Sequence, residues 1–332
     1  MFAAAGLSRE AAHTVATGLV EADLRGTSSH GSLLVPMYVE RIRKGSVTTA
    51  EQAEVVLDAG AIAVLDARHC LGLLSGDQAM AIAVDKAKAH GVGVVTVRHA
   101  FHFGGAFRYV RSAVAAGCIG IAAANTRPLM PAPGGAAAVV GNNPLAIGVP
   151  SAGGEPIVLD MALSEASLGK VRLAEKDGRP IPATWATDAE GRPTTDPGEA
   201  LSGMLQPAAG HKGYGLALMI DVLSGVLSGG SFGAGVRGLY ADTTVPNDCA
   251  HFFLALHVSA FGDPDDFATR LGELSAQITG SPLAPGNRQP LLPGQPEAER
   301  AAAAKGVTLS PSVLNGLRET AASLGVELGE PS

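Results

Sequence analysis

The chain has 332 residues, of which 46% are hydrophobic and 17% charged, and its formal net charge is −7. This composition is typical of a globular protein with a sizeable core and excludes a disordered chain. The sequence has no basic block or aromatic–basic stripe, so we expect no nucleic-acid partner. Its three cysteines form no C-x-x-C pair, and we identify neither a signal peptide nor a bilayer-spanning apolar run. We therefore expect a cytoplasmic protein that does not associate with membranes.

The first half of the chain alternates between helix and strand patterns. Ser8–Leu24 has apolar residues at helical spacing, and Ser8 is suited to cap the start of that helix. Asp77–His90 is also predicted as a helix, because Gly91 supplies the residue type that commonly ends one. The other predicted elements here are a polar turn (Arg25–Ser32), helices (Val35–Lys44, Gly105–Ala116) and strands (Glu54–Asp58, Ile62–Asp66, Gly93–Arg98, Ile119–Asn125).

The second half begins with a stretch of different character. Thr126–Pro150 is dense in Pro, Gly and Asn and is predicted to be mostly loop. Asp177–Pro197 is a long polar loop that holds the only tryptophan, Trp185, and loops of this length are usually functional or mobile. The remaining predicted elements are strands (Ile157–Asp160, His251–Val258), helices (Tyr214–Leu227, Asp263–Thr279, Glu297–Lys305, Ser310–Leu324) and a connector (Ser281–Pro296). This order indicates an α/β or α+β protein.

Three motif matches stand in the wrong context for their usual function. Gly233–Gly238 matches the dinucleotide fingerprint G-x-G-x-x-G, but it follows a helix instead of a strand, so we interpret it as a flexible turn. Ser231 lies in a G-x-S-x-G match that lacks the strand–turn–helix context of hydrolases. Ser167 begins an S-x-x-K match, but its usual K-T-G partner is missing. A serine hydrolase built on either serine remains an alternative class.

Histidines and glycines mark the candidate chemistry. His30, His102 and His211 lie at a turn, a strand end and a helix start, where a histidine can donate or accept a proton. The alternative for each is a simple structural role in its turn. His102 is favoured, because the glycines that follow at 104 and 105 let a ligand approach the backbone closely. Lys212 begins a glycine-rich helix start that suits an anion such as a pyrophosphate, or is an ordinary solvated lysine.

Six segments together resemble the malate/L-lactate dehydrogenase family, which has a non-Rossmann NAD(P) fold and includes ureidoglycolate dehydrogenase, sulfolactate dehydrogenase and piperideine-2-carboxylate reductase. The likeness runs from about Ala5 to about Arg300. It implies a mixed α/β fold with a largely antiparallel central sheet wrapped by helices, in a homodimer whose site lies near the subunit interface. It further implies a helical substrate and dimerisation part, 1–50 joined in space by 259–332, and a cofactor-binding domain, 51–258. The segments are Ala22–Val47, Val97–Gly104, Asn125–Pro150, Leu159–Lys170, Pro193–Pro197 and Gly210–Gly230.

The resemblance also implies an activity and its residues. The reaction is reversible hydride transfer between NAD(P)H and a small 2-oxo acid, or an imine analogue, without a metal. His102 matches the general acid/base, and His30 and Tyr38 match substrate-side positions. Asp188 is a candidate second acid or lid residue. The expected cofactor-binding residues are Thr126, Asp160, Met161, Ala162, Ser164 and Lys212, and the choice between NAD and NADP stays open.

One departure from the family pattern concerns the substrate. The family usually has an arginine where this chain has Leu34, and that arginine holds the substrate carboxylate. Losing a hydrogen bond to a charged group costs about 1.5–3 kcal/mol. Arg127 is our candidate replacement, with Arg108 and His99 as weaker ones; the alternative is an exposed Arg127 and a more apolar pocket. The change leaves room for a cyclic imine or another non-standard substrate, and for a relative that only binds the dinucleotide.

Overall fold

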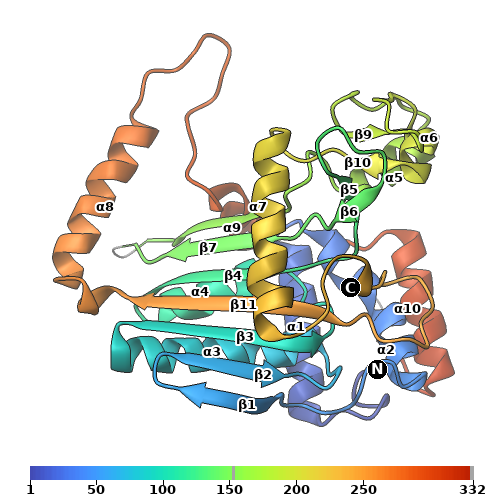
Figure 1. Ribbon diagram of the computed structural model, residues 1–332, viewed down its shortest axis with the longest axis horizontal. Helices are drawn as coiled ribbons and strands as arrows, with labels where there is room; N and C mark the ends of the chain where they lie inside the picture. Colours follow the sequence, from blue (N-terminus) through green and yellow to red (C-terminus); the bar gives the residue numbers. More distant parts are fainter. Residues whose placement is uncertain (152–153, 330–332) are drawn as a thin grey trace.

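The computed structural model describes residues 1–151 and 154–329 and is built around one seven-stranded sheet (Figure 1). Its strand order is β1-β2-β3-β11-β4-β7-β8. Only β2 and β3 pair in parallel; the other neighbours are antiparallel, which confirms the expected largely antiparallel sheet. The strands are β1 (Glu54–Ala59), β2 (Ile62–Asp66), β3 (Val92–Ala100), β4 (Cys118–Ala124), β7 (Leu145–Val149), β8 (Ile157–Met161) and β11 (Cys249–His257).

Helices cover both faces of this sheet. α3 (Gly72–His90) and α4 (Phe107–Ala115) pack on one face, and α7 (His211–Asp221) crosses the other (Figure 1). Glycines in the strands let α3 and α4 pack closely on the sheet, because a Cβ at Gly93 would collide with α3 and one at Gly120 would collide with α4. α7 continues as a π-helical turn (Val222–Val226), so the apolar helix predicted at 214–227 is present.

The N-terminal helices form a second core with the end of the chain. α1 (Arg9–Leu24), α2 (Val35–Arg43) and α10 (Pro311–Ser323) pack together, and α9 (Gln295–Ala303) lies against α1. α8 (Pro264–Thr279) projects from the body (Figure 1). The division at 50 and 258 stays a prediction.

Most predicted elements are present, and their caps explain why. Ser8 accepts a hydrogen bond from the amide of Ala11 at 3.1 Å and caps α1, while Gly91 ends α3 with φ 82°. α3, however, begins at Gly72, five residues before the predicted start. Glycines at 72 and 76 weaken the local helix signal. They are needed because side chains there would collide with the backbone of Phe101 and with Tyr109.

The stretch 126–150 is mostly loop, as predicted, but it also contains three strands that were not predicted. They are β5 (Met130–Pro131), β6 (Ala138–Val140) and the sheet strand β7. β7 forms because β4 and β8 pair with it on either side, which local sequence does not reveal. Four further short elements were also missed: α5 (Leu168–Lys176), β9 (Ala186–Thr187), α6 (Pro197–Ser202) and β10 (Met204–Leu205). In the described part of the chain, no helix combines the length and hydropathy needed to cross a membrane.

Candidate active site

One large cavity of about 970 Å³ lies where the ends of β4, β8 and β11 meet the start of α4. This volume is at the upper end for ligand sites and has room for a dinucleotide with a small acid. His30, His102, Thr126 and Arg127 line it, together with Asp160–Ala162. Residues expected at the site from segments more than 100 positions apart are therefore brought together by the sheet. Gly104 and Gly105 line the same cavity.

His102 is held from behind by Tyr38. The Tyr38 hydroxyl lies 2.6 Å from His102 Nδ1 and 3.4 Å from the His102 carbonyl oxygen. Burial raises the pKa of Tyr38 well above its usual value, so this hydroxyl keeps its proton. Because the hydroxyl can donate to the His102 carbonyl while its oxygen accepts from Nδ1–H, we assign the ring proton of neutral His102 to Nδ1. Tyr38 itself is fully buried and belongs to the helical core, so its place is behind the histidine.

Two further histidines accompany His102. His30 stacks on it with ring centroids 5.3 Å apart, and the Ser29 hydroxyl holds His30 Nδ1 at 2.9 Å. His251, in β11, is fully buried and stacks on Phe103 at 4.6 Å. Burial lowers the pKa of His102 well below its usual value, and the neighbouring histidines add to this. Burial likewise lowers the pKa of His30, and that of His251 to about 3. All three rings are neutral at pH 7.

Asp160 gives the cavity an acceptor suited to a ribose hydroxyl. Its Oδ2 accepts a hydrogen bond from the Phe107 amide at 2.8 Å, while Oδ1 has no partner in the described residues. The side chain is open to the cavity yet surrounded by protein, which raises the pKa of Asp160 to about 6. At pH 7 it is therefore largely ionised and can accept from a ligand. This chemistry and the size of the cavity fit a nicotinamide dinucleotide.

Not every predicted residue reaches the cavity. Within residues 1–151 and 154–329, Ser164, Asp188 and Lys212 are absent from its walls. Ser164 donates to the Ala166 carbonyl at 2.8 Å, and Lys212 is exposed at the start of α7. Asp188 is paired with Arg192 at 2.8 Å in its own loop, and its bonds to Arg192 lower the pKa of this carboxyl.

The residues considered as replacements for the missing substrate-binding arginine differ in whether they are free to bind an anion. Leu34 is buried in the helical core, and Arg108 forms a two-pronged pair with Asp77 at 2.9 and 2.7 Å. His99 is held by Asp66 at 2.9 Å. Arg127 lines the cavity and takes part in no ion pair among the described residues. Partial desolvation lowers the pKa of Arg127, and the positive charge of Arg172 lowers it further. Arg172 is therefore a second cation close to Arg127.

Sequence reasoning missed several residues of the cavity wall. Arg237 lies inside the Gly233–Gly238 motif match that was interpreted as a turn, Tyr240 follows it, and His251 lies in a strand without any motif. In the sequence, these residues differ from their neighbours only by being charged or polar in apolar or glycine-rich segments. Only the folded chain shows that they lie in one cavity wall. The other missed residues that bear charges are Arg25, Lys170, Arg172 and Glu297.

Neither serine of the hydrolase alternative has a catalytic partner. The Ser231 hydroxyl donates directly to Asp248 at 2.6 Å, so no histidine takes its proton. Ser167 caps α5, where its oxygen accepts from the Lys170 amide at 3.3 Å. A serine nucleophile needs a general base within hydrogen-bond reach, and these two hydroxyls are occupied in other ways.

Comparison with known proteins identifies the family. The family model described as malate/L-lactate dehydrogenase matches residues 1–318. The chain belongs to this family. It is 38% identical over 307 residues to ureidoglycolate dehydrogenase (NAD(+)) of Escherichia coli O157:H7, which covers 92% of this chain and 87% of that protein. It is 35% identical over 328 residues to malate/(S)-sulfolactate dehydrogenase of Methanothermus fervidus, and this alignment covers 98% of this chain and 94% of that protein.

Solved structures agree with this assignment. The fold matches Δ1-piperideine-2-carboxylate reductase of Pseudomonas syringae pathovar tomato with a TM-score of 0.85 and 28% identity, over 96% of this chain and 95% of that one. The expected non-Rossmann family fold is therefore confirmed. The chain is an NAD(P)-dependent oxidoreductase of the malate, sulfolactate and ureidoglycolate dehydrogenase type. Its relatives are named with NAD(+) or with NADP(+), so the cofactor is one of these two.

Proposed function

We propose that this protein catalyses the reversible oxidation of a small 2-hydroxy acid to its 2-oxo acid, with His102 as the general acid/base. The observation that carries the proposal is His102 itself, which lines the cavity with Nδ1 held by Tyr38 and Nε2 left to act. Bound NAD(P) supplies or accepts the hydride at the substrate carbon. The protein's own contribution is to orient the acid and to exchange a proton with its oxygen.

Tyr38 allows His102 to change its protonation state without losing support. In the neutral ring, Nδ1–H donates to the tyrosine oxygen, and the tyrosine hydroxyl donates to the His102 carbonyl, 3.4 Å away. Nε2 then has a free lone pair, and the ring becomes an imidazolium when Nε2 takes the proton of a substrate hydroxyl. Nδ1–H keeps its bond to the tyrosine oxygen in both protonation states. In the reducing direction the same steps run backwards, and Nε2 gives its proton to the substrate oxygen.

The cations of the cavity favour an acid with two negative groups. Arg127 and Arg172 both line the wall without an ion-pair partner in the described chain. A guanidinium is the natural partner of a carboxylate or sulfonate, because its N–H groups match two oxygens at once. With Leu34 unable to provide a cation, we assign Arg127 to the carboxylate of the substrate and Arg172 to a second anionic group. Malate and sulfolactate have such groups, whereas lactate does not.

A cyclic imine is the alternative substrate that Leu34 raises. His102 would then protonate or deprotonate nitrogen, so the acid/base geometry alone does not separate the two. The arginine pair favours the dianionic hydroxy acid, because a cyclic imino acid has only one carboxylate. A serine hydrolase is not favoured by the comparisons or by the contacts of either serine.

A substrate panel tests the proposal. Malate, sulfolactate, lactate, ureidoglycolate and a cyclic imine are each assayed with both cofactors by the absorbance of reduced nicotinamide. We expect the highest kcat/KM for a dianionic acid. Higher kcat/KM for the imine than for any hydroxy acid would reverse the choice of substrate. Turnover of none of the compounds, in a protein that binds the cofactor, would refute the proposed reaction.

We also propose that the active form is a cytoplasmic homodimer, as the family resemblance implies. α7 and its π-helical turn expose a stripe of large apolar side chains at helical spacing, and such patches mark interaction surfaces. The stripe consists of Leu216 (42% exposed), Met219 (49%), Leu223 (38%) and Val226 (50%). Light scattering behind a sizing column should give twice the chain mass, and Leu223→Glu should shift it to the monomer. A monomeric wild type would contradict this.

A further inference from the structure

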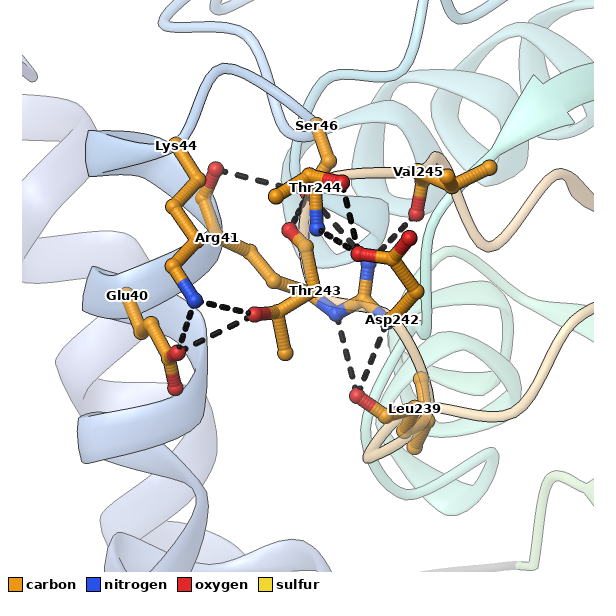
Figure 2. Close-up of polar contacts among 9 residues, drawn as sticks. All are labelled: Glu40, Arg41, Lys44, Ser46, Leu239, Asp242, Thr243, Thr244 and Val245. Carbon is orange, nitrogen blue, oxygen red and sulfur yellow. Dashed lines mark hydrogen bonds and ion pairs between the residues drawn. The ribbon is translucent and has the colours of Figure 1, made fainter.

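Arg41 is the largest fully buried side chain of the protein as described, and its partners are chiefly backbone carbonyls. Nε donates to the Leu239 carbonyl at 3.0 Å, and Nη2 donates to the carbonyls of Leu239 at 2.9 Å and Gly238 at 3.1 Å. Nη1 donates to the Val245 carbonyl at 2.8 Å and to Ser46 Oγ at 3.2 Å. All five N–H donors of the guanidinium are therefore satisfied. Figure 2 shows the bonds to Leu239 and Val245.

This arrangement replaces a counter-ion with a loop. No carboxylate of the described chain pairs with Arg41, and a buried charge is destabilising unless its donors are satisfied. Residues 238–245 contain neither helix nor strand, so they have no ladder of their own to fix their course. The guanidinium provides those hydrogen bonds from outside. We call residues 238–245 the wall loop.

The wall loop forms part of the cavity beside the candidate substrate arginine. Residues 238–241 line the cavity. Gly238 lies so near Arg127 that a Cβ there would stand 3.0 Å from Arg127 Cδ. A displacement of the wall loop would therefore change the space available to Arg127.

Arg41 also lies beside the support of His102. Tyr38, which holds His102 Nδ1, is three residues earlier on α2. The Arg41 guanidinium lies 5.7 Å from the centre of the Phe101 ring, and Phe101 directly precedes His102. One side chain thus contacts both the wall loop and the residue next to the catalytic histidine.

We propose that Arg41 is a positioning residue that fixes the wall loop, and through it Arg127, relative to His102. It holds the pocket in the form that binds the substrate acid and takes no part in proton or hydride transfer. The inference rests on the proposed function for its kinetic consequence. The anchoring of the loop is a separate claim with its own measurement.

The test compares Arg41→Lys with Arg43→Lys. Arg43 is on the same helix, but its guanidinium bonds to Ser323 of α10 at 3.3 Å and not to the wall loop. Arg41→Lys keeps the charge but leaves most of the five hydrogen bonds unmade. We expect KM for the substrate acid to rise at least tenfold, kcat to stay within threefold and the cofactor Kd to stay unchanged. Arg43→Lys should match the wild type in all three.

A second readout needs no turnover. Tyr240 is 58% exposed, and chymotrypsin cleaves after such a residue once its loop is released. We expect cleavage at Tyr240 to be at least tenfold faster in Arg41→Lys and unchanged in Arg43→Lys. If Arg41→Lys does not fold, Ser46→Ala serves instead, because Ser46 Oγ accepts from Arg41 Nη1 and donates to the Thr243 carbonyl of the wall loop. It should raise KM, speed cleavage at Tyr240 and leave kcat unchanged.

Each outcome decides the inference. Unchanged KM together with unchanged cleavage in a folded Arg41→Lys overturns it. A parallel fall in kcat, substrate affinity and cofactor affinity also overturns it, because that pattern indicates a general structural role. If the wild type turns over no acid, the proposed function fails, and the cleavage rates alone then decide whether Arg41 anchors the loop.

Discussion

Removing the hydroxyl of Tyr38 isolates the contact that makes His102 a directed acid/base. In Tyr38→Phe, His102 Nδ1 loses its partner at 2.6 Å, and the ring is no longer held with its proton on Nδ1 and its lone pair on Nε2. The lost bond matters most when the ring becomes an imidazolium. Hydrogen bonds to charged groups contribute about 1.5–3 kcal/mol. Since 1.4 kcal/mol is a factor of ten, kcat should fall roughly 10- to 150-fold.

The assay is steady-state oxidation of the preferred hydroxy acid, with cofactor Kd measured separately by fluorescence of the reduced nicotinamide. Tyr109→Phe is the matched control, because Tyr109 is equally buried and its hydroxyl donates to the Phe103 carbonyl instead of to a histidine. We expect the control to lose stability but keep kcat, and both variants to keep cofactor affinity. The reasoning is refuted if Tyr38→Phe retains kcat within twofold, or if the two variants lose kcat equally.

Three further predictions follow from the same site. His102→Ala should abolish turnover while cofactor binding survives. In the wild type, the oxidation rate should fall as pH drops below 6.5 through the lowered pKa of His102, whereas the reduction rate should fall as pH rises. Parallel pH profiles for the two directions would contradict the assignment. Arg127→Ala should raise substrate KM roughly 10- to 100-fold, and an unchanged KM for every accepted acid would remove Arg127 from the substrate site. His251 has a pKa of about 3 when folded against 6.5 when unfolded, so below pH 6.5 the unfolded chain binds a proton that the folded chain does not. Urea unfolding of the wild type between pH 7 and pH 4.5 should therefore lose about 3 kcal/mol that His251→Phe keeps; any packing cost of the variant is present at both pH values, and equal losses in the two proteins would contradict this origin.

Local sequence was informative where a residue acts on its own neighbours. Ser8 caps α1 because its hydroxyl reaches an amide three residues on, and Gly91 ends α3 because a left-handed residue is needed there. The same reasoning placed His102 at a strand end beside two glycines that line the cavity. The family resemblance added the antiparallel sheet and the kind of chemistry, which neither periodicity nor composition contains.

Local sequence failed where a partner lies far along the chain. β7 is a strand because β4 and β8 flank it, and Gly72 begins a helix because a distant backbone needs the space. The candidate site shows the same limit. Asp188 looked suited to catalysis but pairs with Arg192 in its own loop, while Arg172 reaches the cavity from a helix that was not predicted.

The sequence by itself determined the class of the protein, its main helices and strands, and the histidine about which its chemistry is proposed. Each of these depends on spacing, capping or motif order along a short stretch of chain. Only the tertiary structure decided which charged groups share the cavity and which are neutralised elsewhere. Arg41 illustrates the reason: it acts on carbonyls about 200 residues away, and no pattern within α2 distinguishes it from Arg43, which faces α10.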